Sequence, residues 1–195
     1  RPVIKKHTVH NNGKVETPTD QHGLAIPYAY LMDAETGAVL YENQADVKMA
    51  PASMTKILTA YIVMDKIKQG DLQENQLLTV SKKAFRREGT TMFLNMGQQI
   101  SVLDLLKGLI ITSGNDAAVV FAEALAGTEE NFSNMMNAYA KKMGMNNTNF
   151  LNASGIPVEG HYTTARDLAL IAHRVYTDFP QYFSLWGTQE YTFNG

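Results

Sequence analysis

Residues 51–60 read PASMTKILTA, and they place Ser53 three positions before Lys56 at the start of an apolar run. The opening proline is typical of a first helical turn and Gly70 of the residue after a helix, so we expect a helix over about 52–69. Its apolar residues occupy most of the circumference, which is typical of a buried helix. Because residues three apart share a helix face, Ser53 and Lys56 are expected to lie side by side.

The Ser53–Lys56 pair can support nucleophilic catalysis. A serine hydroxyl is a weak nucleophile until a neighbouring base takes its proton, and an exposed, protonated lysine cannot do so. Burial disfavours the ammonium and lowers the lysine pKa, so Lys56 can serve as a neutral base if this helix start is buried. The same tetrapeptide also fits a helix-start serine with a lysine whose charged end extends to solvent. Ser-x-x-Lys alone does not separate these two interpretations.

A second polar group, Ser113-Gly114-Asn115, stands between two apolar helical segments further along the chain. Gly114 permits a sharp turn. Ser113 can pass a proton between Lys56 and a leaving amine, and Asn115 offers a donor and an acceptor to a substrate amide. An ordinary helix–helix corner uses the same residue types, so this triplet by itself also leaves both interpretations open.

The remaining chain predicts many helices and few strands. Two strand-like runs at 28–32 and 38–42 flank a turn over 33–37, as in a hairpin, and a last strand-like run lies at 189–195. We therefore expect an α+β fold in which a helical lobe packs on a sheet. The other helices are expected after the cap Ser101, over 116–126, over 129–143 after Thr128, and from Thr163 or Thr164 to Asp178.

Composition excludes several classes of protein. The 195 residues fit one domain or one lobe of a larger domain, and 45% hydrophobic residues indicate a real core. A formal net charge of −2 without a basic stripe argues against nucleic-acid binding. The absence of cysteine excludes disulfides and thiol catalysis, and no metal-ligand spacing such as H-E-x-x-H occurs. We expect no metal and no cofactor.

The first 23 residues differ from the rest of the chain. They are polar and show no periodicity, so we expect residues 1–23 to be a flexible leader and the folded part to begin at residue 24. The leader lacks the apolar core of a signal peptide, and we expect any export signal to be absent from this sequence. No apolar run approaches the roughly 18 residues that a membrane-spanning helix needs.

In combination and order, Ser-x-x-Lys followed by Ser-x-Asn resembles the penicillin-recognising serine enzymes. The longer stretches 32–61, 89–127, 163–172 and 190–195 are similar to the D-alanyl-D-alanine carboxypeptidases, the low-molecular-weight penicillin-binding proteins of serine peptidase family S11. The resemblance covers about 24–195. It implies the penicillin-binding, β-lactamase-like transpeptidase fold, an α+β fold with a helical lobe on an antiparallel sheet.

The resemblance also implies a role for each candidate residue. Ser53 would attack the carbonyl of the penultimate D-alanine, with Lys56 as general base and its own backbone N–H as an oxyanion donor. Ser113 would relay the proton to the departing D-alanine, and Asn115 would orient the substrate's peptide amide. The implied partners are peptidoglycan stem peptides and β-lactam antibiotics. The implied location is the bacterial periplasm or cell envelope, with peripheral membrane association of a full-length parent.

Two alternatives belong to other functional classes. A class A β-lactamase would need a glutamate followed closely by an asparagine, but Glu159 is followed by Gly160 and His161, and no Glu-x-x-x-Asn pattern occurs there. Gly114 also matches the carboxypeptidases, where a β-lactamase has Asp. The other alternative is a non-catalytic module of the same fold that binds wall peptide or a partner protein.

The third motif of the family, Lys-Thr-Gly, does not occur in this sequence. In the family it lies on a central strand a short distance beyond the segment that matches 190–195. We therefore expect residues 24–195 to be the N-terminal portion of the catalytic domain, with an incomplete sheet and without the C-terminal domain. We also expect residues 1–195 on their own to be impaired as an enzyme.

Overall fold

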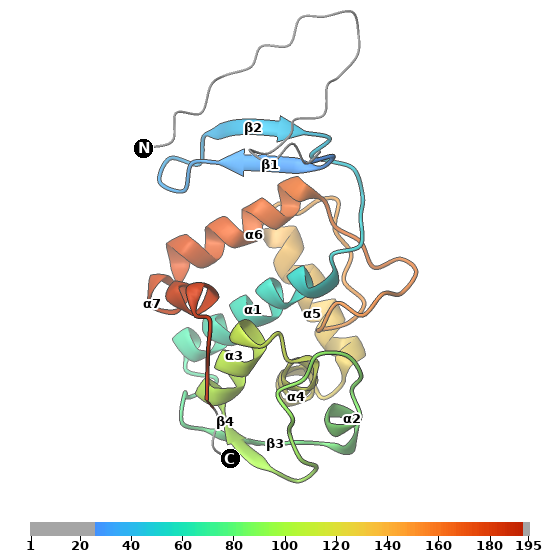
Figure 1. Ribbon diagram of the computed structural model, residues 1–195, viewed down its shortest axis with the longest axis vertical. Coiled ribbons are helices and arrows are strands. Elements are labelled where there is room, and N and C mark those ends of the chain that lie inside the picture. The colour runs from blue at the N-terminus through green and yellow to red at the C-terminus, as the bar shows by residue number, and fades with distance from the viewer. Residues whose placement is uncertain (1–25, 193–195) are drawn as a thin grey trace, which may run out of the picture.

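The central element of the fold is α1 (Thr55–Gln69), which runs through the middle of the molecule (Figure 1). The computed structural model describes residues 26–192, so the expected leader lies outside the described residues. Most side chains of α1 up to Met64 are buried, which confirms the prediction of a buried helix. α1 packs against α3 (Val102–Ile111), α4 (Asn115–Ala126), α5 (Glu129–Lys142) and α6 (Ala165–Asp178).

Three of these helices begin at the side-chain caps that the sequence predicts. The hydroxyls of Ser101, Thr128 and Thr164 each accept a backbone N–H from the residue three positions later. Such local bonds satisfy the free N–H groups of a first turn, so α3, α5 and α6 have starting points fixed by their own sequence. α1 has no side-chain cap. Only its C-terminal end is fixed by a local feature, the left-handed conformation of Gly70 (φ +84°).

The predicted hairpin is confirmed at one end of the molecule (Figure 1). β1 (Ala29–Met32) pairs antiparallel with β2 (Val39–Asn43). The carboxylate of Asp33 organises the turn, because it accepts from the backbone N–H groups of Glu35 and Thr36.

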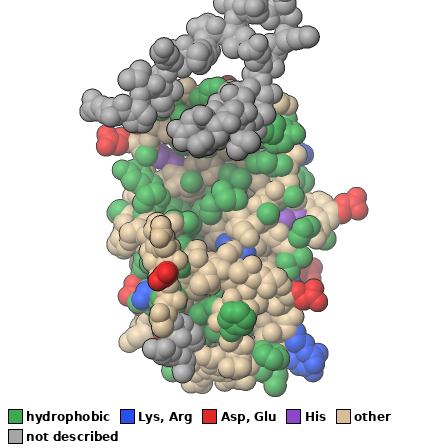
Figure 2. Space-filling view, viewed as in Figure 1, with side chains coloured by type: hydrophobic (Ala, Val, Ile, Leu, Met, Phe, Trp, Pro, Cys, Tyr) green, Lys and Arg blue, Asp and Glu red, His purple; other side chains and the backbone are tan. Residues whose placement is uncertain are grey.

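A two-stranded hairpin is marginal alone, and this one rests on α6. Arg166 at the start of α6 binds Asp46 and Glu42 and lies over the ring of Tyr30. Apolar side chains of the hairpin nevertheless stay at the surface, including Leu31, and Figure 2 shows many apolar side chains on the upper part of this face. Arg166 therefore has a structural role, since it ties the hairpin to the start of α6.

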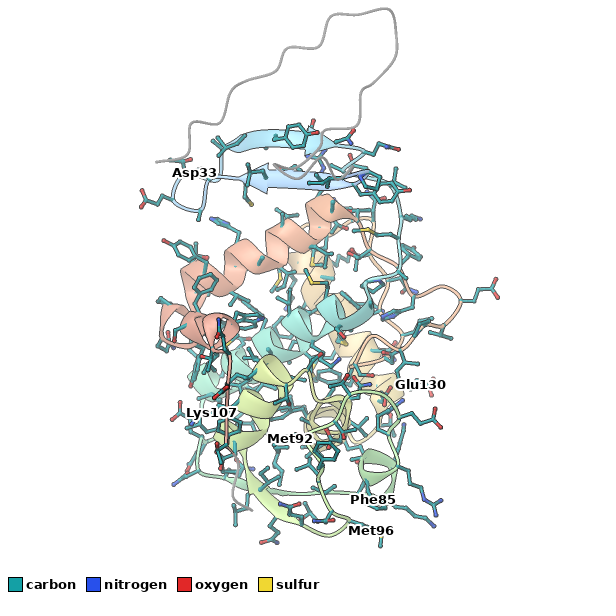
Figure 3. The ribbon with its side chains drawn as sticks, in the orientation of Figure 1. Asp33, Phe85, Met92, Met96, Lys107 and Glu130 are labelled. Atoms are coloured by element: carbon teal, nitrogen blue, oxygen red, sulfur yellow. The ribbon has the colours of Figure 1, made fainter. Side chains whose placement is uncertain are left out.

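The other end of the molecule holds a second, smaller ribbon (Figure 1). β3 (Leu77–Thr79) pairs antiparallel with β4 (Gln99–Ser101), and the short helix α2 (Lys82–Phe85) follows β3. The side chains of Phe85 and Met96 mark this end in Figure 3, opposite Asp33 of the hairpin. The sequence did not predict β3 and β4, because three residues are too few to show an alternating pattern.

The strand expected at 189–195 is wrong over 189–192, and residues 193–195 lie outside the described part. After α6 the chain forms α7 (Pro180–Phe183) and η2 (Ser184–Gly187). The segment that follows runs extended along α3 (Figure 1). Tyr191 donates to Asp104 Oδ1 (2.5 Å) and packs under the Lys107 ammonium. A strand needs a neighbouring strand for its backbone bonds, and within 26–192 this segment meets helical side chains.

Among the described residues, no helix combines the length and the apolar character that crossing a bilayer requires.

Asp116 joins the start of α4 to a loop at 88–98. Its buried carboxylate accepts from the backbone N–H groups of Met92 (3.0 Å), Leu94 (3.2 Å) and Ala117 (2.9 Å). Met92 of this loop, labelled in Figure 3, packs against Gly108 of α3, where a Cβ would lie 2.2 Å from the Met92 sulfur. Asp116 was not singled out from the sequence, since its partners are distant in the chain.

Replacing Asp116 with Asn tests this anchor. An amide would turn an NH₂ group toward backbone donors, so we expect Asp116→Asn to lower the free energy of unfolding by about 2–3 kcal/mol. Urea denaturation of the complete natural protein measures the loss. The exposed Asp71→Asn, which loses only a surface ion pair with Lys66, should leave stability nearly unchanged. Equal effects of the two substitutions would contradict the anchoring role.

Candidate active site

Ser53 lies in a short turn before α1 and not in α1 itself. This turn, η1 (Ala52–Met54), leaves Ser53 and Met54 exposed to solvent. Ala52 has φ +47°, a left-handed conformation that is unfavourable for a residue with a Cβ. The expected helix over 52–69 is therefore confirmed only from Thr55 onward, and a constrained backbone presents Ser53.

Lys56 is buried, as the sequence led us to expect. Its side chain is 5% exposed, and its Nζ donates to the carbonyl of Ser154 (2.9 Å). The same Nζ lies 3.4 Å from Ser53 Oγ, a long contact of a kind that often shortens when substrate binds. Burial disfavours the ammonium and lowers the pKa of Lys56 to about 8. About one tenth of the Lys56 side chains are then neutral at pH 7.

A loop at 149–163 packs under the Ser53 turn and the start of α1. Besides the Ser154 carbonyl on Lys56, the Ala153 carbonyl accepts from Thr59 Oγ1 (2.7 Å). Gly155 comes so close that a Cβ there would lie 1.8 Å from the Ala52 carbonyl oxygen. Only glycine fits, and the sequence analysis did not find this contact. The Ser-Gly pair within a loop was the available signal.

The Ser113-Gly114-Asn115 corner separates α3 from α4, as predicted. Ser113 has φ +56°, an unfavourable value for serine. Asn115 is largely buried: its backbone N–H donates to Thr90 O (2.7 Å) and its Nδ2 donates to Glu88 O (2.8 Å). Within residues 26–192, no hydrogen bond uses the second amide hydrogen or the carbonyl oxygen of the Asn115 side chain.

The structure joins the predicted site residues to different degrees. Ser53 and Lys56 are in direct contact, and α4, which carries Asn115, packs against α1. Among residues 26–192, no hydrogen bond links Ser113 to Ser53 or Lys56. Within the same residues, the Ser113 hydroxyl makes no hydrogen bond to any other group either.

Comparison with known proteins identifies similar chains. The sequence profile of the D-alanyl-D-alanine carboxypeptidases, peptidase S11, matches residues 15–195. D-alanyl-D-alanine carboxypeptidase DacC of Escherichia coli (strain K12) is 42% identical over 170 residues, which cover 84% of this chain and 42% of DacC.

Solved structures agree with the sequence comparison. The crystal structure of D-alanyl-D-alanine carboxypeptidase DacD from Francisella tularensis gives a TM-score of 0.83 at 37% identity, over 91% of this chain and 43% of that one. Penicillin binding protein 5 from Haemophilus influenzae gives 0.83 at 36% identity, over 86% and 50%. These superpositions confirm the predicted penicillin-binding fold. The chain spans half the length of these proteins or less.

Removing the Lys56 amine should change stability in a pH-dependent way. A pKa of about 8, against 10.5 for a free lysine, means that holding the ammonium buried costs about 3 kcal/mol at neutral pH. The bond to Ser154 O offsets part of that cost. We therefore expect Lys56→Met to raise the free energy of unfolding by about 1–2 kcal/mol at pH 7.

The sign of the pH dependence follows from the lowered pKa. Between about pH 8 and 10.5 the unfolded chain binds more protons at Lys56 than the folded chain, so the wild type gains stability as pH rises. Lys56→Met lacks this gain, and its advantage should shrink between pH 7 and pH 10 in denaturant titrations. The exposed Lys141→Met is the control. An advantage that stays constant with pH would contradict the buried, perturbed amine.

Proposed function

Because the chain belongs to the D-alanyl-D-alanine carboxypeptidase family, peptidase S11, we propose that it carries the nucleophile and base of a serine D-Ala-D-Ala carboxypeptidase. The proposal rests chiefly on one observation: the buried amine of Lys56 lies one turn from the hydroxyl of Ser53. Since the matched region makes up only 42–50% of the similar proteins, residues 24–195 are proposed as the N-terminal portion of the catalytic domain. The Lys-Thr-Gly motif would complete the site.

The proposed acylation step uses the described residues in order. Neutral Lys56 takes the proton of Ser53 Oγ, and the oxygen attacks the carbonyl carbon of the penultimate D-alanine. The backbone N–H of Ser53 stabilises the negative oxygen. The carbon–nitrogen bond then breaks while Ser113 passes the proton from Lys56 to the nitrogen of the departing D-alanine. Water hydrolyses the ester on Ser53 and restores the free hydroxyl.

The proposed substrate is the stem peptide of peptidoglycan. Asn115 would bind its peptide amide through the carbonyl oxygen and the amide hydrogen that Glu88 leaves free. A penicillin carries a reactive amide that Ser53 would open in the same way, and the resulting ester would hydrolyse slowly. The proposed substrate would place the protein outside the cytoplasmic membrane, in the bacterial cell envelope, and peripheral membrane association is part of the same proposal.

Covalent labelling tests the proposed nucleophile. We expect the complete natural protein to be labelled by a fluorescent penicillin and to release D-alanine from a stem pentapeptide. Ser53→Ala should lose both activities, because no hydroxyl remains to form the ester. The exposed Ser184→Ala serves as control and should behave as wild type. Label that persists on Ser53→Ala, or maps by mass spectrometry to another residue, would refute the assignment.

The pH dependence of acylation tests the proposed base. Only neutral Lys56 accepts the Ser53 proton, so the acylation rate constant should rise about tenfold per unit below pH 8 and level off above it. Stopped-flow measurement of penicillin acylation between pH 5.5 and about 9.5 gives the profile. A rate constant that is unchanged between about pH 6 and pH 8 would exclude a lysine with this pKa as the base.

A further inference from the structure

The geometry of the Ser53 turn is not fixed by its own sequence. Neither η1 nor α1 has a side-chain cap, and Ala52 holds an unfavourable φ of +47°. Such a conformation persists only where surrounding contacts impose it. The contacts that hold Ser53 in place must therefore come from elsewhere in the chain.

His161 makes one of these contacts from the end of the 149–163 loop. Its buried ring has a partner on each nitrogen: Nδ1 accepts the backbone N–H of Leu151 (2.9 Å), and Nε2 lies 3.0 Å from Thr55 Oγ1. A backbone N–H can only donate, so Nδ1 carries no proton. The neutral ring then bears its proton on Nε2 and donates it to the Thr55 hydroxyl.

Thr55 links this bond to the reacting groups. It is fully buried, it is the first residue of α1, and it stands between Ser53 and Lys56. A bond that fixes the Thr55 side chain therefore fixes the backbone that carries the hydroxyl on one side and the amine on the other.

The loop that carries His161 is itself anchored. Asn149 and Tyr162 form an antiparallel bridge across its base, and Thr163 bridges to Met49, just before the Ser53 turn. The ring of Phe150 packs edge-on against the His161 ring. These contacts hold the His161 ring in place. Because its tautomer is also fixed, the ring can hold the Thr55 side chain in one position.

We infer that His161 is a positioning residue for the Ser53 nucleophile, acting through Thr55. The inference rests on the proposed function. His161 does not touch the reacting atoms, and its bond to Thr55 sets the distance between Ser53 Oγ and Lys56 Nζ. Burial lowers the pKa of the His161 imidazole, which keeps it in the neutral form that this bond requires.

The chain offers a matched control for this role. Thr59, one turn further along α1, is equally buried and donates to the Ala153 carbonyl of the same loop. Thr55→Val and Thr59→Val each remove one hydroxyl from α1 and one bond to the loop, at constant shape. Only Thr55 adjoins the Ser53 turn, so the pair separates positioning from general stability.

The experiment uses the complete natural protein and measures the acylation rate constant and the non-covalent dissociation constant of a fluorescent penicillin, together with Tm. We expect Thr55→Val and His161→Leu to slow acylation about tenfold or more with little change in the dissociation constant, because reacting groups displaced by a fraction of an ångström lose rate. Thr59→Val should lower Tm comparably and acylate within about twofold of wild type. His161→Gln, which can also accept from Leu151 and donate to Thr55, should restore most of the rate.

Each result decides the inference. Thr55→Val acylating as fast as Thr59→Val, or His161→Gln acylating as slowly as His161→Leu, would overturn the positioning role and leave the proposed function intact. If His161→Leu fails to fold, Thr55→Val against Thr59→Val still decides. A wild type that penicillin does not acylate would overturn the proposed function and this inference together.

Discussion

The amine of Lys56 lies within an apolar helix, one turn from a serine hydroxyl, and is almost closed off from water. Keeping an ammonium there is unfavourable, and that cost is what brings its pKa to about 8. The other helices contribute by surrounding α1 on most sides, so the enclosure that stabilises the fold also generates the base. Within α1, folding and proposed chemistry depend on the same burial.

The 149–163 loop, which is far from α1 in the sequence, completes the enclosure. Its carbonyls at Ala153 and Ser154 accept from Thr59 and Lys56, and Gly155 allows it to approach the Ala52 carbonyl. These contacts hold the start of α1, which has no side-chain cap of its own. The helices α3, α5 and α6 have their own caps and serve as the scaffold. By contrast, the start of α1, which carries the proposed base, is determined by contacts with distant parts of the chain.

The parts of the fold that could be predicted are those with local causes. The caps at Ser101, Thr128 and Thr164, the hairpin turn and the end of α1 at Gly70 each depend on bonds within a few residues. The three-residue strands β3 and β4 were missed because each is defined by its pairing with the other and not by a pattern in its own residues. The strand expected at 189–195 does not form over 189–192 for the same reason, since Tyr191 there meets a side chain of α3 where a neighbouring strand would be required.

The sequence by itself determined that Ser53 and Lys56 lie side by side, that the helix carrying Lys56 is buried, and to which family the motifs are similar. Spacing and hydrophobicity suffice for the placement of the pair and for the burial of the helix because both act along one helix. The family followed from the resemblance of the motifs and not from these patterns. Only the tertiary structure decided the strained φ of Ala52, the carbonyl that binds the Lys56 amine, and the imidazole of His161 on Thr55. These contacts join segments roughly one hundred residues apart, and no local pattern encodes which distant groups will meet once the chain has packed.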